Sequence, residues 1–194
     1  MRFLHGWKLV RMTKLYLVRH GRAAAGFGEQ ADPGLDATGQ AQAQAVGERL
    51  SRQAQGLILS SPLKRARETA APLAALWNRA PVIEQAVGEI PSGGKSLAER
   101  AAWLRGFMAG SWRDAPFGLA QWREGVIAAL IAQKEDAVIF SHYVAINVAA
   151  GAALGEDRVV VFSPDNCSVT IFETEGTLLK LIEMGAQAPL TKVN

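Results

Sequence analysis

Two of the three histidines in the chain stand directly after short apolar runs. The run Lys14–Arg19 precedes His20, and the run Ala137–Ser141 precedes His142. Short apolar runs of this kind are typical of buried strands, and ligands of open α/β sheets bind outside the carboxyl ends of such strands. Either histidine alone would be interpreted as a structural side chain. Both together, with arginines close by, favour a shared site.

Two arginines accompany these histidines. Arg19 immediately precedes the first of them, and Arg65 lies in the first turn of the helix expected after the run Gly56–Ser60. We expect Ser61 to be the N-cap of that helix and Pro62 its first residue. Cations are disfavoured near this positive end of a helix dipole, so a bound anion would offset the conflict. A guanidinium group binds phosphate oxygens with two parallel hydrogen bonds, which makes phosphate the expected ligand.

These residues suit the transfer of a phosphoryl group through a histidine. Hydrolysis of a phosphate monoester is very slow without a catalyst, and a covalent intermediate divides it into two easier steps. Histidine has an ordinary pKa of about 6.5, and neighbouring guanidinium groups favour its neutral, nucleophilic form. We therefore take His20 as the nucleophile and His142 as a hydrogen-bond donor to the phosphoryl oxygens. Gly21 is expected to let the backbone approach the phosphate closely.

The leaving group of such a reaction needs a proton from an acidic side chain. Glu84, Glu89 and Glu99 all lie in the segment between the second and third predicted strands. Glutamate is most often a solvated surface residue. The spacing does not choose among the three.

The elements that must position these residues alternate along the chain. Apolar runs predict strands at Lys14–Arg19, Gly56–Ser60 and Ala137–Ser141. Alanine-rich stretches with helical spacing predict helices at Thr38–Gln55, Pro62–Trp77, Ser96–Met108, Phe117–Gln133 and Val144–Leu154. This alternation predicts an α/β fold, a three-layer α/β/α sandwich with a mainly parallel central sheet. Near the end, Cys167–Phe172 and Leu178–Glu183 flank the turn 173–176 and predict a C-terminal β-hairpin at one side of the sheet.

The composition is that of an ordinary globular protein. Apolar residues make up 49% and charged residues 20% of the 194 residues, which is enough apolar material for a core. No linker or change of composition divides the chain. We therefore expect a leader at residues 1–13, without a function, and a single domain at residues 14–194.

Charge and cysteine usage exclude several classes of protein. The formal net charge is +3, and the basic residues are scattered rather than interleaved with aromatic ones. This pattern argues against nucleic-acid binding and fits a mildly anionic ligand. No apolar span or secretory signal suggests a membrane protein or an exported one. The single cysteine, Cys167, excludes an internal disulfide, suits the cytoplasm, and is expected to be a small buried residue rather than a catalytic thiol.

Some further residues are candidates for the edge of the site. Lys95, Arg100, Trp103 and Trp112 follow Glu89 and are candidates for the substrate entrance, although most of them are expected on a helix surface or in the core. Asn166 and Ser168 precede the hairpin and either border the pocket or shape a turn, and we favour the turn.

Three motifs resemble the signatures of the histidine phosphatase superfamily, also called the phosphoglycerate mutase-like family. The first is Leu17–Gly21, with its Arg-His-Gly sequence; the second is Ser60–Ala70; and the third is Ser141–His142. They occur in the order found in the family. Residues 32–43 also resemble the family's link into its first helix, so the resemblance runs from about Lys14 to the C-terminal hairpin.

The resemblance implies a role for each residue of the site. It implies a phosphohistidine at His20, phosphate contacts from Arg19, Arg65 and His142, and a proton donor at Glu89. In branches with a Glu-Ile pair at this point, the glutamate has that role. No metal and no organic cofactor is implied, and the expected partner is a small phosphorylated metabolite or a phosphoprotein.

The sequence departs from the family pattern directly after the nucleophile. Arg22 and residues 23–26 stand where mutases and many phosphatases have an acidic or amide residue followed by hydroxyl and asparagine side chains. The segment between Arg65 and His142 is also short for the substrate-covering insertion of glycolytic mutases. Because a mutase must shield its phosphoenzyme from water, these departures favour a phosphatase. Arg22 is a candidate to bind a second anionic group of the substrate.

Three alternatives stay open. A mutase-type phosphotransferase would use the same residues. A non-catalytic module that binds phosphorylated ligands is a second alternative, although the complete residue set counts against it. A protein phosphohistidine phosphatase is the third; its substrate has a good leaving group, so indifference to the loss of Glu89 would support it. The sequence does not indicate the oligomeric state.

Overall fold

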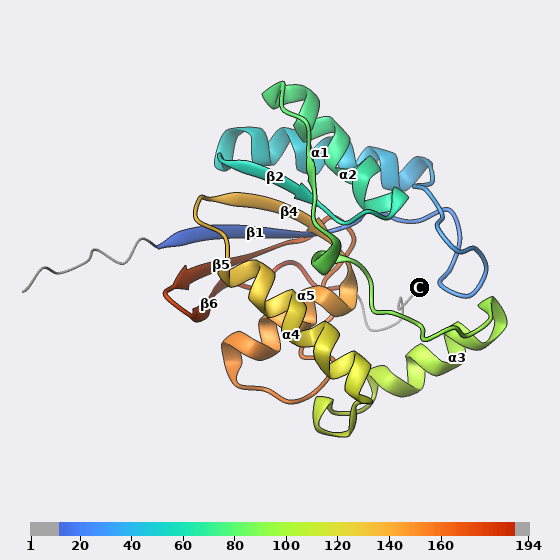
Figure 1. Cartoon of the computed structure of the whole chain (residues 1–194). Coiled ribbons are helices and arrows are strands. Elements are labelled where there is room, and N and C mark those ends of the chain that lie inside the picture. Colours follow the sequence, from blue (N-terminus) through green and yellow to red (C-terminus); the bar gives the residue numbers. More distant parts are fainter. Residues whose placement is uncertain (1–11, 189–194) are drawn as a thin grey trace, which may run out of the picture.

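A six-stranded sheet forms the centre of the molecule (Figure 1). The structure is a computed structural model that describes residues 12–188. The strands are β1 (Thr13–Arg19), β2 (Leu57–Ser60), β3 (Val82–Ile83), β4 (Ala137–Ser141), β5 (Val169–Glu175) and β6 (Leu178–Glu183). Their order in the sheet is β3-β2-β4-β1-β5-β6. The first four strands are parallel, whereas β5 runs antiparallel to β1 and pairs with β6 as a hairpin at one edge.

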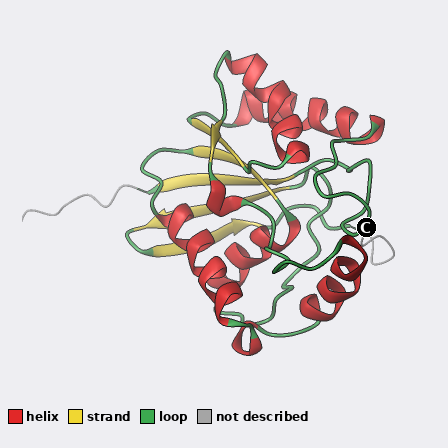
Figure 2. Ribbon diagram, turned by 45° about the vertical axis from the view of Figure 1, so that its right-hand side comes forward, coloured by secondary structure: helices red, strands yellow, loops and turns green. Residues whose placement is uncertain are grey.

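Helices cover both faces of this sheet (Figure 2). They are α1 (Ala37–Gln53), α2 (Lys64–Trp77), α3 (Leu97–Met108), α4 (Phe117–Ile131) and α5 (Tyr143–Leu154), with short 3₁₀ turns at Gln85–Val87 and Trp112–Asp114. In Figure 1, α1 and α2 lie on one side of the sheet and α4 and α5 on the other, while α3 extends beyond the ends of the strands. The predicted α/β sandwich with a mainly parallel sheet and a terminal hairpin is confirmed.

Each central strand contributes to two separate cores because successive side chains point to opposite faces. On β4, Val138 and Phe140 pack in the cluster beneath α1 and α2, whereas Ile139 packs in the cluster on the other side. On β1, Leu17 and Val18 divide in the same way. Burial on both faces explains why these strands are continuous apolar runs in the sequence.

The second helix begins later than the sequence predicts. Its N-cap is Leu63, which makes no capping hydrogen bond with its side chain, so the expected N-cap role of Ser61 is wrong. The amide of Lys64, the first helical residue, donates instead to the carboxylate of Asp32 at 2.8 Å. Asp32 caps the helix from a distant loop, which local sequence patterns cannot reveal.

Other element boundaries also differ from the prediction. Residues 1–11 of the expected leader lie outside the described residues, and Thr13, its last residue, is buried at the start of β1. Strand β5 continues to Glu175, so the hairpin turn is shorter than the predicted turn 173–176, with Gly176 at a φ of +64°. The two-residue strand β3 was not predicted, because a strand this short has no detectable periodicity.

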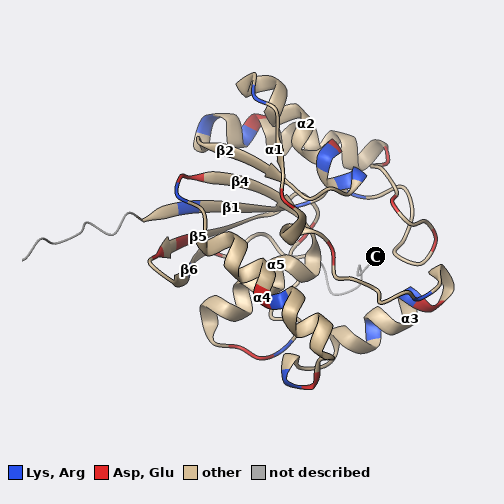
Figure 3. Ribbon diagram, viewed as in Figure 1, with Lys and Arg blue, Asp and Glu red and all other residues tan. Residues whose placement is uncertain are grey.

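Charged residues are distributed over many elements of the structure (Figure 3). Lys and Arg residues lie on several helices and loops rather than on one face, and α5 carries no charged residue. Within residues 12–188, no helix is long and apolar enough to cross a bilayer.

The loop after β1 packs tightly on the first turn of α1. Asp36 caps α1 by accepting a hydrogen bond from the Gly39 amide at 2.7 Å. A Cβ atom at Gly39 would lie 2.1 Å from the Arg22 carbonyl oxygen, and a Cβ atom at Gly21 would lie 2.6 Å from the Gly39 carbonyl oxygen. The two glycines therefore allow backbone to meet backbone, and this contact fixes the loop that follows His20.

We predict that Gly39→Ala destabilises the protein although alanine is the better helix former. The added methyl group must displace the Arg22 backbone, and the free energy of unfolding should fall by about 2 kcal/mol. Gly125 provides a matched control, because it is exposed in the middle of α4 and a Cβ atom there would meet nothing within 4 Å. Gly125→Ala should raise the free energy of unfolding by about 0.5–1 kcal/mol. Urea unfolding measures the free energy of unfolding of both variants. Equal values for the Gly39 variant and wild type would contradict the proposed backbone contact.

Candidate active site

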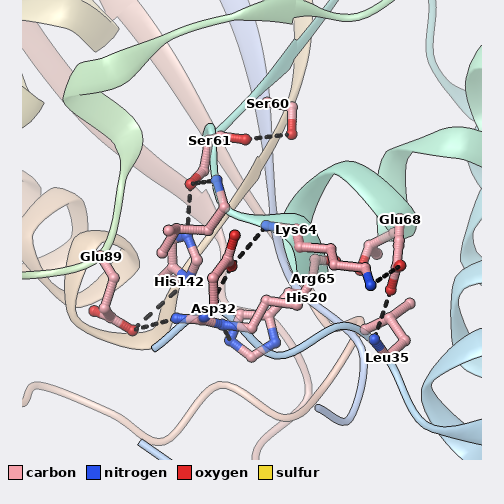
Figure 4. A network of polar contacts seen from close by, with 12 residues as sticks. His20, Asp32, Leu35, Ser60, Ser61, Lys64, Arg65, Glu68, Glu89 and His142 are labelled. Carbon is pink, nitrogen blue, oxygen red and sulfur yellow. Dashed lines mark hydrogen bonds and ion pairs between the residues drawn. The ribbon is translucent and has the colours of Figure 1, made fainter. Parts of the chain in front are cut away.

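The loops that follow β1, β2 and β4 meet at one edge of the sheet. These three strands are neighbours and parallel, with Arg19 in register with Ser141, and Ser60 with Phe140. His20 and His142 therefore emerge side by side, with their ring centroids 5.1 Å apart. Figure 4 shows them together with Arg65 and Glu89. The residues predicted from three separate motifs lie in one cluster.

His20 is held in one tautomer, with a single unprotonated ring nitrogen. Its Nδ1 lies 2.8 Å from the Gly21 carbonyl oxygen, which can only accept, so Nδ1 carries the proton. Its Nε2 accepts a hydrogen bond from Arg65 Nε at 3.1 Å and is therefore the unprotonated nitrogen. Burial lowers the pKa of His20 well below its ordinary value, and Arg65 and Arg19 lower it further. At neutral pH the imidazole is uncharged and has its lone pair on Nε2.

His142 is fully buried and is oriented by Ser61. Its Nε2 lies 2.7 Å from Ser61 Oγ, and the same hydroxyl oxygen accepts the Leu63 amide proton at 3.2 Å. The hydroxyl proton of Ser61 is then free to be donated to Nε2, which leaves the ring proton of His142 on Nδ1. Among residues 12–188 this Nδ1 has no hydrogen-bond partner, and it lies 3.7 Å from Glu89 Oε2. Burial, then His20 and Arg65, lower the pKa of His142 well below its ordinary value.

Two buried arginines flank the histidines. Arg19 donates from Nη1 to the Pro164 carbonyl oxygen at 2.9 Å, and its guanidinium carbon lies 5.1 Å from the centroid of the Tyr143 ring. Within the described residues its Nε has no partner. Arg65 places Nη2 3.8 Å from Glu89 Oε2. Burial lowers the pKa of both guanidinium groups and Glu89 raises it, but arginine keeps its charge at neutral pH.

Only one of the three candidate glutamates lies in this cluster. Glu84 caps a 3₁₀ turn by accepting the Ala86 amide at 3.0 Å, and Glu99 forms the capping box of α3 with Ser96. Glu89 is largely buried beside the arginine and the second histidine. Burial raises the pKa of its carboxyl group, while Arg65 opposes this shift. Glu89 therefore has both the place and the raised pKa that a proton donor needs.

The residues directly after the nucleophile have other contacts than the sequence suggests. Gly21 is not part of the cavity lining; its amide donates to Thr69 Oγ1 at 3.0 Å, and its missing side chain serves the packing on α1. Arg22 does line the cavity. Its guanidinium group, however, is bonded to Asp36 at 2.5 Å and to Thr38 at 2.8 Å.

The sequence did not reveal the contacts of several supporting residues. Thr69 links the loop after β1 to α2, because its hydroxyl accepts from Gly21 and donates to the Arg65 carbonyl oxygen at 2.7 Å. Asn166 donates from Nδ2 to the His20 carbonyl oxygen at 3.0 Å and lines the cavity, so it does more than shape a turn. Ser61 lies within the second motif, which was the only sequence signal for its role.

Arg19, His20, Arg65 and Glu89 line a cavity of about 930 Å³, whereas His142 is fully buried and is not among the lining residues. Catalytic candidates line part of it, and the loop after β1 and the helix α3 supply most of the rest. The candidates for the entrance, Lys95, Arg100, Trp103 and Trp112, are not among the lining residues. Trp112 is 6% exposed and packs against Phe107 and Trp122, as expected for a core residue.

The charges around the cluster suit an anion better than a metal ion. His20, Glu89 and His142 each place one possible ligand atom within 4.8 Å of the others, a set that could in principle hold a divalent cation. Arg65, however, already donates to His20 Nε2, and its guanidinium group would repel such a cation. The buried donors Arg19 Nε and His142 Nδ1 also call for an acceptor. A phosphoryl group supplies both negative charge and acceptor oxygens.

Solved structures with the same fold include several enzymes. A mycobacterial glucosyl-3-phosphoglycerate phosphatase has a TM-score of 0.72 and 21% identity, with 91% of this chain and 100% of that chain covered. A phosphoserine phosphatase of Entamoeba histolytica, in complex with 3-phosphoglyceric acid, has a TM-score of 0.65 and 26% identity, with 82% and 90% covered. A protein described as mycobacterial hydrolase 1 has a TM-score of 0.73 and 22% identity, with 92% and 100% covered.

The sequence itself decides the family. No curated protein matches it. Residues 15–187, which include all three motifs and Glu89, match the family described as the histidine phosphatase superfamily (branch 1). The chain therefore belongs to the histidine phosphatase superfamily.

Proposed function

We propose that the protein hydrolyses phosphate monoesters through a phosphohistidine at His20, with Glu89 as the proton donor and without a metal ion. One observation carries this proposal: the unprotonated Nε2 of a neutral His20 accepts a hydrogen bond from a buried arginine and lies within reach of a carboxyl group of raised pKa. A nucleophile, a binding site for negative charge and an acid are then present together.

In the first step, the lone pair of His20 Nε2 attacks phosphorus and the bond to the ester oxygen breaks. Arg19, Arg65 and the Nδ1 proton of His142 bind the phosphoryl oxygens as negative charge builds up on them. Glu89 gives its proton to the departing alkoxide, so an alcohol leaves. Arg65 Nε, which is bonded to His20 Nε2 at 3.1 Å, would turn its hydrogen bond to a phosphoryl oxygen.

In the second step, water attacks the phosphohistidine and Glu89 takes up its proton. The nitrogen–phosphorus bond breaks, His20 regains its lone pair, and inorganic phosphate leaves. The proton on His20 Nδ1 stays bonded to the Gly21 carbonyl oxygen throughout, which keeps the reactive lone pair on Nε2.

The proposed substrate is a small phosphorylated metabolite, and the proposed outcome is hydrolysis rather than transfer. The similar structures that carry names of activities are phosphatases of small phosphate esters, which supports the first part. Residues 23–26, directly after Arg22, support the second, because they lack polar side chains that would hold a reorienting intermediate for a mutase.

We predict that His20→Ala abolishes the release of phosphate. Turnover of aryl phosphates, sugar phosphates and phosphoglycerates without added metal should fall by about 10³-fold or more, because no other residue can form the intermediate. Malachite-green detection of phosphate from wild type and variant in parallel checks this. Comparable turnover by the variant would overturn the assignment of His20 as the nucleophile. Absence of turnover by wild type, with phosphate compounds still bound, would favour a mutase or a binding module.

We predict that Glu89→Gln lowers kcat for alkyl phosphates by about 10²–10⁴-fold, because the amide cannot protonate an alkoxide. Glu84→Gln is the matched control, since Glu84 lies in the same segment but caps a 3₁₀ turn outside the cluster. The kcat for hydrolysis of a phosphohistidine protein should change little in either variant, because this substrate already has a good leaving group. Equal losses for both glutamate variants would contradict the assignment of the acid.

Wild type and Glu89→Gln should also differ in their dependence on pH. The depressed pKa of His20 keeps the nucleophile neutral well below pH 6.5, so kcat/KM should not fall with His20 protonation until the pH is lower still. The raised pKa of Glu89 keeps the acid protonated above pH 4.5, and activity should decline as the pH rises through that pKa. Glu89→Gln should lack this basic limb, although the substrate titrates identically. A persistent limb would assign it to another group.

We predict that Ser61→Ala lowers kcat by about 10-fold, the effect of losing one hydrogen bond of about 1.4 kcal/mol, with little change in KM. Without the hydroxyl, nothing fixes the ring proton of His142 on Nδ1. Ser60→Ala is the control, because Ser60 is equally buried but donates to the Ser61 carbonyl oxygen instead. Nitrogen NMR shifts of His142 should report a changed tautomer in the first variant only, and unchanged shifts in both would remove Ser61 from the mechanism.

A further inference from the structure

The cavity continues beyond the catalytic residues into a space between two segments that are far apart in the sequence. One is the loop that follows His20, and the other is helix α3. In Figure 1 these segments face one another at the edge of the molecule where the strands end. Their side chains decide what kind of leaving group the site can hold.

Helix α3 turns an apolar face toward this space. The lining residues Leu97, Ala101, Leu104 and Met108 recur at helical spacing, so they form one stripe. A neighbouring face packs on the core through Trp103, which stacks on Phe107 at a centroid distance of 5.9 Å. No residue of α3 is fully buried, and Leu97 remains 36% exposed. Leu104 and Met108 also pack against the core, whereas Leu97 and Ala101 do not, so the stripe runs from the edge of the core to apolar surface at the cavity.

The opposite wall contains small and apolar residues among its polar ones. It includes the alanines at 23–25, Phe27 and Ala31. At Gly28 the loop touches α3 directly: a Cβ atom there would lie 2.9 Å from the Leu97 carbonyl oxygen and 3.1 Å from Ala101 Cβ. This backbone contact joins the two walls, so the folded structure itself fixes the distance between them.

Most polar side chains in the lining outside the catalytic cluster already have partners in the protein. Arg22 is bonded to Asp36, and Glu29 accepts the Gly26 amide at 2.8 Å. Asn166 donates to the His20 backbone. The two lining side chains without such bonds among residues 12–188, Gln30 and Arg105, are solvent-exposed. Apart from these two, few groups are left to bind the carboxylate, amino or hydroxyl groups of a small polar leaving group.

We propose that the substrate is a phosphomonoester whose leaving group is a bulky, mainly apolar alcohol that packs between α3 and the loop after β1. This inference rests on the proposed hydrolase function and adds the substrate class. The cavity volume of about 930 Å³ is in the range of sites for drug-sized ligands, far more than a three-carbon acid would fill. Because this space is continuous with the phosphate site, the apolar group that fills it would be the alcohol attached through the ester oxygen.

The first test compares esters whose leaving groups have similar chemistry. Ethyl phosphate, glycerol 3-phosphate, phosphoserine and 2-phenylethyl phosphate all release a primary alcohol, so differences in kcat/KM report binding of the organic group. Wild type should prefer 2-phenylethyl phosphate over ethyl phosphate by about 30-fold, as expected for burying a phenyl-sized apolar group. Equal or better hydrolysis of phosphoserine or glycerol 3-phosphate would overturn the substrate class and leave the hydrolase intact. No hydrolysis of any ester would overturn both.

The second test changes the apolar wall. Ala98 also lines the cavity and is exposed, so Ala98→Trp narrows the space and should lower kcat/KM for 2-phenylethyl phosphate by about 10-fold or more, with a smaller loss for ethyl phosphate. Ala102→Trp is the matched control, because Ala102 is exposed on the same helix and is not part of the lining. Leu97→Asn, at a partly exposed position that tolerates a polar residue, should also reduce the preference for the phenylethyl ester. An unchanged preference in both lining variants would contradict the proposal.

Discussion

The hydrogen bond from Arg65 Nε to His20 Nε2 joins the two halves of the site, and much of the structure serves to hold it. His20 lies in the loop after β1 and Arg65 in the first turn of α2, which follows β2, and the two strands are separated in the sheet by β4. Thr69 ties the loop after β1 to α2, and Asp32 caps this helix. The geometry therefore depends on strand order and on loop contacts rather than on any single motif.

Burial is what gives these side chains useful chemistry. It lowers the pKa of both histidines and raises that of Glu89, so that neutral bases and a neutral acid can coexist at one place. The two arginines reinforce the first effect and oppose the second. Their positive charge attracts a phosphoryl group, whose arrival would in turn favour the protonated form of Glu89.

The sequence predicted the fold class and the histidines and arginines of the central cluster from local signals, whereas Glu89 was implied only by the family resemblance. Apolar runs that end in histidine or serine mark parallel strands, and three motifs mark their loops. Contacts between distant segments left no such signal. Ser61 was expected to be a helix cap but binds His142, and the packing of Gly21 on Gly39 could not be predicted from the sequence.

The central claim is that His20 receives the phosphoryl group on Nε2. Rapid acid-free quenching of wild type during turnover, followed by peptide mass spectrometry and phosphorus NMR of the phosphopeptide, tests it most directly. The account predicts one phosphoryl group on the peptide that contains His20, attached through Nε2, because Nδ1 is bonded to the Gly21 carbonyl oxygen. Attachment to His142, attachment through Nδ1, or turnover without any phosphoenzyme would contradict it.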